Sequence, residues 1–148
     1  MNLFGLLQVS GSALTAERLR AEVVTSNLAN AETTRTNDGG PYRRKMVLFN
    51  AEPSSPFHLL LANSAGEASG PVSGGVRVSD VVDDPTPPEQ RYEPGHPDAD
   101  KNGFVAYPAI NPTQEMVDLM GSERAYELNA SAVQAAKQMI QQSLQILK

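Results

Sequence analysis

Histidine and aspartate are the residue types in this chain that could support catalysis or hold a metal ion. The chain has two histidines, His58 and His96, and no cysteine. The lack of cysteine excludes thiol catalysis, disulfides and cysteine-ligated metals. Both histidines lie beside or near prolines, and no catalytic triad, nucleophile elbow or HExxH helix can be assembled around either. We therefore expect no catalytic residue.

A short acidic segment imitates the first half of a calcium-binding loop. Asp98, Asp100 and Asn102 stand at ligand positions one, three and five, and Gly103 supplies the turn glycine at six. Position twelve, which needs a bidentate glutamate, is Ala109. We weigh calcium binding against an Asx-rich turn and favour the turn. No metal and no cofactor are expected.

The charge distribution gives little support to a nucleic-acid site. The net charge is −5, and the 12 lysines and arginines are scattered. Only Arg43, Arg44 and Lys45 are contiguous, whereas nucleic-acid binding calls for a basic patch or stripe. We interpret this triplet as the solvated or partner-facing part of a strand.

The two ends of the chain carry the elements that must position everything else. Both ends have apolar residues at alternating spacings of four and three, a heptad pattern that favours helices winding around each other. Six of eight such positions are apolar at the N-terminal end and eight of ten at the C-terminal end. We predict one helix from near Leu3 to about Asn30 and another from Pro112 to near Lys148, with Asn111 as its N-cap.

The C-terminal helix carries a second apolar stripe on another side. Because a helix that is apolar on two sides is buried on two sides, the N-terminal helix can cover only one of them. We expect other subunits to cover the rest, although a monomeric helical bundle completed by the β region stays open. The predicted assembly interface comprises Leu3, Leu7, Leu14, Val24, Asn27, Leu28, Asn30, Met116, Leu119, Tyr126, Val133, Met139, Ile140, Leu144 and Leu147.

Between the helices the sequence predicts a small β region, so the fold class is α+β. Strands are predicted at Tyr42 to Phe49, Val76 to Val82, Arg91 to Glu93 and Phe104 to Tyr107. Residues 51–75 are rich in Pro, Ser, Gly and Ala, which predicts a long surface loop or disordered insertion. The expected organisation is an N-terminal helix over 1–35, a β-rich domain over 36–110 and a C-terminal helix over 111–148.

Neither end reads as a targeting or membrane segment. The first sixteen residues lack a basic n-region, so no cleaved signal peptide is expected. The stretch 128–146 carries one charge, Lys137, but also five glutamines, too many amides to bury in lipid. We do not expect insertion into the membrane.

Several blocks together resemble the bacterial flagellar rod and hook protein family. They are 26–30 (SNLAN) followed by two threonines, 39–44 (GGPYRR), 92–100 (YEPGHPDAD), 111–119 (NPTQEMVDL) and 124–129 (RAYELN). The resemblance covers nearly the whole chain except the insertion. It implies a structural subunit of the proximal rod of the basal body, whose terminal helices form the inner coiled-coil layer of a helical drive shaft that transmits torque.

The same resemblance implies the partners and the location. The expected partners are copies of this chain, other flagellar rod proteins and the flagellar type III export apparatus, with no nucleic acid and no small-molecule substrate. The expected location is the periplasmic rod of the basal body. A self-contained enzyme or binding module with a site near His96, Asp98 and Asp100 is the alternative function.

The loop from Glu93 to Gly103 has two open interpretations. It could contact a neighbouring subunit, because its prolines restrict the backbone and lower the entropy lost on docking. It could equally brace the last helix against the β region. The predicted contact residues are Pro94, Gly95, His96, Pro97, Asp98 and Asp100.

Overall fold

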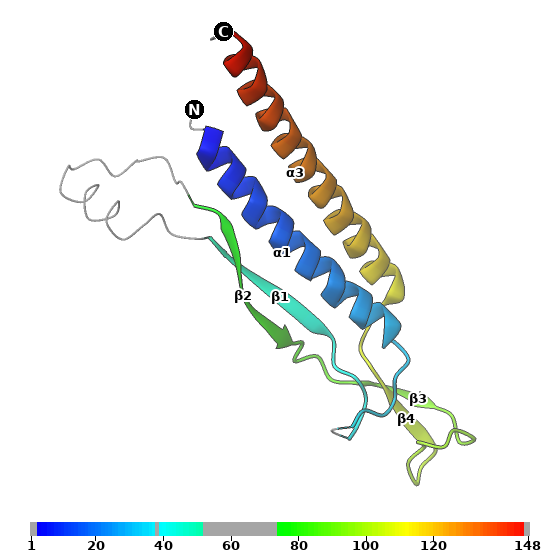
Figure 1. Cartoon of the computed structure of the whole chain (residues 1–148). Coiled ribbons are helices and arrows are strands. Elements are labelled where there is room, and N and C mark those ends of the chain that lie inside the picture. The colour runs from blue at the N-terminus through cyan, green and yellow to red at the C-terminus, as the bar shows by residue number, and fades with distance from the viewer. Residues whose placement is uncertain (1–2, 38, 52–73, 147–148) are drawn as a thin grey trace, which may run out of the picture. The chain divides into compact units, whose positions relative to one another are not determined.

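The computed structural model describes residues 3–37, 39–51 and 74–146. In this part of the chain two helices enclose four strands in sequence order, which confirms the predicted α+β class (Figure 1). The elements are α1 (Leu3–Ala29), β1 (Lys45–Ala51), β2 (Val76–Asp83), β3 (Glu89–Tyr92), β4 (Phe104–Tyr107) and α3 (Pro112–Ile146).

Most element boundaries lie close to the expected ones, but the strand expected from Arg91 to Glu93 spans Glu89–Tyr92. The strand expected from Tyr42 begins at Lys45, because the preceding residues serve other contacts: the Tyr42 amide donates to the Thr33 carbonyl at 3.0 Å and the Arg44 carbonyl accepts from Asp84 at 2.7 Å. Most of the predicted loop 51–75, with His58, lies outside the described residues, as do Leu147 and Lys148.

The start of α3 confirms the predicted cap. The Asn111 Oδ1 accepts hydrogen bonds from the amides of Thr113 at 3.0 Å and Gln114 at 3.4 Å. Pro112 occupies the first helical position, where its missing amide proton costs nothing. Glu115 places an acidic side chain in the first turn, where the helix dipole favours negative charge.

The strands form two separate two-stranded sheets, β1 with β2 and β3 with β4. The second pair is antiparallel, and its register places Glu89 opposite Tyr107 and Tyr92 opposite Phe104. Gly103 precedes β4 with a φ of 81°, a left-handed conformation that glycine adopts without strain.

The chain divides into two compact units, and each unit contains sections of both helices. The first unit takes its described residues from Met1–Arg18, Phe49–Ser79 and Glu123–Lys148. The second unit comprises Leu19–Leu48 and Asp80–Ser122. The division into three consecutive segments stays a prediction.

Among the described residues of the first unit, the buried side chains are small. Ser10, Ala16 and Ala136 are buried there, and the Ser12 hydroxyl accepts a hydrogen bond from the Val76 amide at 3.0 Å. Small side chains let backbones approach closely but bury little apolar area each. The described part of this unit therefore buries little apolar side-chain area.

The second unit holds most of the buried side chains of the described residues. Apolar members are Val24, Val105, Tyr107, Pro108 and Ile110. The polar members are Asn27, Glu115 and Ser122, each only 1% exposed. Because buried polar groups are costly unless they are hydrogen-bonded, this unit depends on how its polar side chains are paired.

The covered positions of α3 differ from its heptad stripe. Met116, Tyr126 and Leu144, which belong to that stripe and to the predicted assembly interface, are 51%, 44% and 61% exposed. The fully covered positions of α3 are instead Glu115, Ser122 and Ala136. A heptad pattern shows only how apolar residues are spaced. In this structure the covered positions of α3 carry small or hydrogen-bonded side chains.

Candidate functional site

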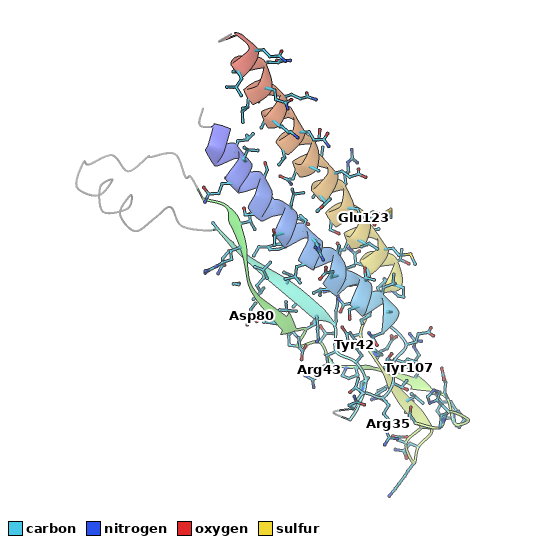
Figure 2. All side chains as sticks on the ribbon, viewed as in Figure 1. Arg35, Tyr42, Arg43, Asp80, Tyr107 and Glu123 are labelled. Carbon is cyan, nitrogen blue, oxygen red and sulfur yellow. The ribbon has the colours of Figure 1, made fainter. Side chains whose placement is uncertain are left out.

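The second unit contains a network of polar side chains that joins four segments of the chain. We call it the Asn27 cluster; its members are Ser26, Asn27, Tyr42, Arg44, Asp84, Glu115 and Asp118. They come from the end of α1, the segment entering β1, the residue after β2 and the first turns of α3. Figure 2 labels Tyr42, whose hydroxyl lies 3.1 Å from Asn27 Oδ1.

Asn27 is the centre of the cluster and uses both ends of its amide. Its Oδ1 accepts from the Lys45 amide at 2.9 Å and from the Tyr42 hydroxyl at 3.1 Å. Its Nδ2 donates to the Lys45 carbonyl at 2.9 Å and to Glu115 Oε2 at 3.1 Å. The side chain thus pairs with Lys45 as a neighbouring strand would, which only a carboxamide of this length can do.

Glu115 connects α3 to the same cluster through an ion pair. Its Oε1 lies 2.7 Å from Arg44 Nε, and the glutamate side chain is 1% exposed against 24% for the arginine. The guanidinium also lies 3.6 Å from Asp84 and 3.7 Å from Asp118. Both glutamate oxygens therefore have partners, as a buried carboxylate requires.

The charges around Arg44 hold it in the protonated form. Desolvation by burial works to lower its pKa, but the hydrogen bond from Glu115 and the negative charges of Glu115, Asp84 and Asp118 together raise the pKa above its ordinary value. Asp84 behaves in the opposite sense, since hydrogen bonds from the Thr86 hydroxyl and amide, aided by Arg44, lower the pKa of its carboxyl. The guanidinium of Arg44 therefore stays protonated at neutral pH.

Arg44 also corrects the sequence interpretation of the basic triplet. Arg43 and Lys45 are exposed as expected, but the Arg44 side chain is turned into the protein and paired with Glu115. Alternation along a strand could have signalled that the middle residue faces the opposite way. Its carboxylate partners lie about forty and seventy residues further along the chain, so no local pattern could identify them.

The acidic loop is occupied by internal hydrogen bonds. Asp100 Oδ1 accepts from the amides of Asn102 at 2.7 Å and Phe104 at 2.9 Å, which is an Asx turn. Asp98 accepts from the Thr34 hydroxyl at 2.8 Å and lies 3.5 Å from Arg35. Within the described ranges no group of three or more His, Cys, Asp or Glu side chains could hold a metal ion.

His96 belongs to this folded loop. Its Nδ1 accepts from the Asp98 amide at 3.1 Å, and its ring lies edge-on to Tyr107 with centroids 6.3 Å apart. The Tyr107 hydroxyl donates to Glu93 Oε2 at 2.9 Å, and this hydrogen bond, followed by burial and the Glu93 charge, raises the pKa of the tyrosine. The polar side chains near His96 thus bond to groups of the protein itself.

The comparison with known proteins accounts for the whole chain. Residues 7–35 match the family described as "Flagella basal body rod protein", and residues 101–146 match "Flagellar basal body rod FlgEFG protein C-terminal". The flagellar basal-body rod protein FlgC of Bacillus subtilis is 43% identical over 152 residues, covering 100% of both chains. The chain belongs to the FlgC family.

Other FlgC proteins agree over similar lengths. FlgC of Borreliella burgdorferi is 38% identical, covering 100% of this chain and 99% of its own. FlgC of Escherichia coli O157:H7 is 37% identical, covering 97% of each chain. Asn27 lies in the first matched segment and Glu115 in the second, whereas Arg44 lies between them. The Asn27 cluster therefore connects the two segments of this FlgC-family chain that match flagellar rod families.

The structure places the predicted interface residues in three groups. Val24 and Asn27 are buried within the second unit. Half-buried positions are Leu7, Leu14, Leu28, Asn30, Leu119, Val133 and Ile140. Exposed positions are Met116, Tyr126, Met139 and Leu144. The side chains of Leu3 and Leu147 lie outside the described residues, and whether these positions meet other subunits stays a prediction.

Proposed function

We propose that this protein is a structural subunit of the flagellar basal-body rod and assembles through α1 and α3 into the helical shaft that transmits torque. The observation that carries the proposal is the full-length similarity to FlgC proteins of three distantly related bacteria. A subunit of a rotating shaft needs extended contact surfaces rather than a reactive centre, and the long terminal helices supply them.

Exposed apolar side chains on α3 support a partner-facing role. In the second unit these are Met116, Val117 and Met120, and in the first unit Leu128, Met139 and Leu144. Leu128 is 65% exposed. Burying apolar surface contributes about 25 cal/mol per Å², so covering these six side chains in an assembly provides a substantial driving force.

The partners follow from the same role. They are further copies of this chain, other flagellar rod proteins and the flagellar export apparatus, with the loop from Pro94 to Asp100 as a second contact. Three of its six predicted contact residues, Pro94, Gly95 and Pro97, have no polar side chain and are exposed. The loop is therefore a pre-shaped surface held in place by Asp98 and His96.

The proposed location is the periplasmic part of the basal body, reached by export without removal of the N-terminal residues. Ser10 and Ala16 are buried in the first unit, so α1 contributes to the folded protein from its first turns. In the described ranges, no helix is long and apolar enough to cross a membrane. The intact mass of the protein purified from basal bodies tests this point: a mass lacking the first fifteen to thirty residues, typical of signal cleavage, contradicts it.

A catalytic function near His96, Asp98 and Asp100 is not what the geometry favours. Asp98 is bound to Thr34 and Arg35, and Asp100 closes a turn. The relatives carry rod-protein names. We infer a non-enzymatic protein with no small-molecule substrate, no nucleic-acid partner and no cofactor.

Complementation of a deletion strain tests the proposed function. We expect the wild-type gene to restore swimming in soft agar and Leu128→Glu to abolish it, because a charge then occupies the apolar contact. Since Leu128 is exposed, the isolated protein should lose less than about 0.5 kcal/mol of stability. The matched control is Gln134→Glu, which adds the same charge at an exposed polar position of α3.

Two results would contradict the proposal. Either the wild-type gene fails to restore swimming, or Leu128→Glu swims as well as Gln134→Glu. Basal bodies purified from the complemented strain should also contain the protein, which immunoblotting measures directly.

A further inference from the structure

The β3–β4 hairpin of the second unit presents two aromatic side chains on its outward face. The register places Tyr92 opposite Phe104, so both lie on one face, while Val105 belongs to the other. That other face is covered, because Val105 and Tyr107 are only 1% and 8% exposed. Tyr92 and Phe104 are instead 66% and 41% exposed. We call these two side chains the aromatic pair.

The aromatic pair is held in place by contacts within its own hairpin. The two rings meet edge to face with their centroids 5.3 Å apart. The Tyr92 ring also lies against Gly103, where an added Cβ would come within 2.9 Å of Tyr92 Cε2. Because the ring is already oriented, little conformational entropy is lost when a partner covers it. Tyrosine is among the residues that most often contribute strongly to an interface.

A second exposed apolar surface of this unit lies on α3. Met116, Val117 and Met120 are 51%, 53% and 59% exposed, and we call them the methionine patch. At about 100° per residue they fall within one third of the helix circumference. The opposite side of α3 carries Glu115 and Ser122, which are each 1% exposed. The methionine patch therefore points away from the covered side of the helix.

The two surfaces are complementary in their chemistry. Methionine side chains are flexible and polarisable, and their sulfur makes favourable contacts with the edges of aromatic rings. A rigid aromatic pair can therefore pack into a flexible methionine patch. Within one chain the two surfaces leave each other uncovered, since both are exposed. A helical assembly of identical subunits is built from contacts in which one surface of a subunit meets a different surface of the next.

The exposed area indicates that such a contact needs support from other contacts. An aromatic side chain covers roughly 150 to 250 Å², so the exposed fractions of the aromatic pair correspond to roughly 200 Å². At a similar size per side chain the methionine patch adds roughly 300 Å². A stable pair of proteins buries about 1,200 to 2,000 Å². The contact alone is therefore too small to hold two free copies together, but it can form where an assembly supplies further contacts.

We propose that the aromatic pair of one copy docks on the methionine patch of the next copy when the subunits assemble. This inference rests on the proposed function, because it assigns one of the head-to-tail contacts that a helical rod requires. The occupant is a second copy of this chain, since each copy carries both halves of the contact. Tyr92 is the anchor of the aromatic pair, and Met120 is the most exposed member of the patch that receives it.

Cross-linking in assembled basal bodies tests the contact. Because the chain has no native cysteine, Gln90→Cys and Thr113→Cys introduce unique reactive sites. Gln90 shares the outward face with Tyr92, and Thr113 lies two turns before Met120 on the same side of α3; both positions are exposed. With both substitutions in each chain, a short bis-maleimide reagent should give dimers and longer products. The two single variants should give dimers when they are co-expressed and none when each is expressed alone.

The cross-linking controls identify other occupants. Gln90→Cys with Asn37→Cys, a second exposed position of this unit, should give less than a tenth of the product. Dimers from Gln90→Cys alone would mean that the aromatic pair docks on itself. A stronger product with Glu127→Cys than with Thr113→Cys would place the docking site beside Leu128 in the first unit. Either result overturns the proposed contact.

A charge exchange distinguishes docking from a general loss of folding. Tyr92→Lys and Met120→Glu each place a charge in the apolar contact, so each should swim less than half as far as the control Asn37→Lys. With both substitutions in one gene, the lysine of each copy meets the glutamate of the next, and swimming should recover at least twofold over either single variant. Tyr92→Phe keeps the ring and should swim like the wild type. A double variant no better than the single ones contradicts the contact; if the single variants do not accumulate in the cell, the cross-linking result decides.

The outcomes separate this inference from the proposed function. If the wild-type gene restores swimming and the protein is present in basal bodies, a missing product between Gln90→Cys and Thr113→Cys refutes the contact and leaves the rod function intact. If the wild-type gene fails to restore swimming, or the protein is absent from basal bodies, the rod function is wrong and the contact is wrong with it.

Discussion

Asn27→Asp is the smallest change that tests the centre of the cluster, because it replaces one amide nitrogen by oxygen. The Nδ2 donor to the Lys45 carbonyl at 2.9 Å and to Glu115 Oε2 at 3.1 Å disappears. The new carboxylate oxygen faces two acceptors, one of which is itself charged, in a site where both side chains are 1% exposed. The substitution therefore removes two hydrogen bonds and adds a like-charge contact.

The expected loss of stability follows from these terms. A neutral hydrogen bond contributes about 1 kcal/mol and one to a charged group about 1.5 to 3 kcal/mol. Like charges in contact add a further penalty, part of which is relieved when the two carboxyls share a proton. We expect a total of about 3 to 5 kcal/mol, which is a large fraction of the 5 to 15 kcal/mol that typical domains have.

Urea unfolding followed by amide hydrogen exchange in the second unit measures this loss. The control is Asn37→Asp, the same chemical change at an exposed asparagine of that unit, for which we expect less than about 0.5 kcal/mol. Because sharing a proton raises the pKa of the carboxyl pair in the folded state, the Asn27→Asp deficit should shrink in acid and grow as the pH rises. A difference from Asn37→Asp below about 1 kcal/mol would refute the assignment of Asn27 as the centre of the network.

Three further changes test the elements around the cluster. Gly103→Ala should destabilise the β3–β4 pair by about 1 to 3 kcal/mol, because φ is +81° and the new Cβ would lie 2.9 Å from Tyr92 Cε2. Gly121→Ala, with open space around it in α3, should instead stabilise the protein by up to about 1 kcal/mol. Equal effects of the two variants in thermal unfolding would contradict both expectations. Asn111→Ala should cost about 1 kcal/mol through loss of the N-cap, and an unchanged unfolding midpoint in urea would show that the cap bonds to Thr113 and Gln114 contribute nothing. Asp84 has a lowered pKa in the folded state, so its contribution to stability is present above its ordinary pKa and is lost as the pH falls through the folded value. Asp84→Asn should therefore weaken the dependence of stability on acid pH. An unaltered pH profile of the melting temperature would contradict this contribution of Asp84.

The distribution of buried groups explains why the helices have unequal roles along their length. The second unit supplies the hydrogen-bonded interior around Asn27 and Glu115. The first unit buries small side chains, while Leu128 and Leu144 stay exposed. We expect amide exchange in the free protein to be slower in the α1 and α3 sections of the second unit than in those of the first, because its backbone is tied by directional bonds.

Local sequence signals determined the secondary structure of the described chain. Heptad periodicity predicted both helices, and Asn111 with Pro112 marked the start of α3 to the residue. Valine-rich and alternating segments predicted the strands because β-branched residues fit a pleated backbone. Each of these signals acts over a few residues, which is the range over which backbone conformation is decided.

Which side chains meet was decided only by the tertiary structure. The sequence placed Arg44 in a solvated or partner-facing triplet, and the heptad stripe with Met116, Tyr126 and Leu144 did not show which face of α3 the N-terminal helix covers. In the folded protein Arg44 finds Glu115 across seventy-one positions, and small and polar residues occupy the covered face of α3. A heptad pattern records how apolar residues are spaced, but the partners of a buried charge are chosen by which segments the fold brings within hydrogen-bonding distance.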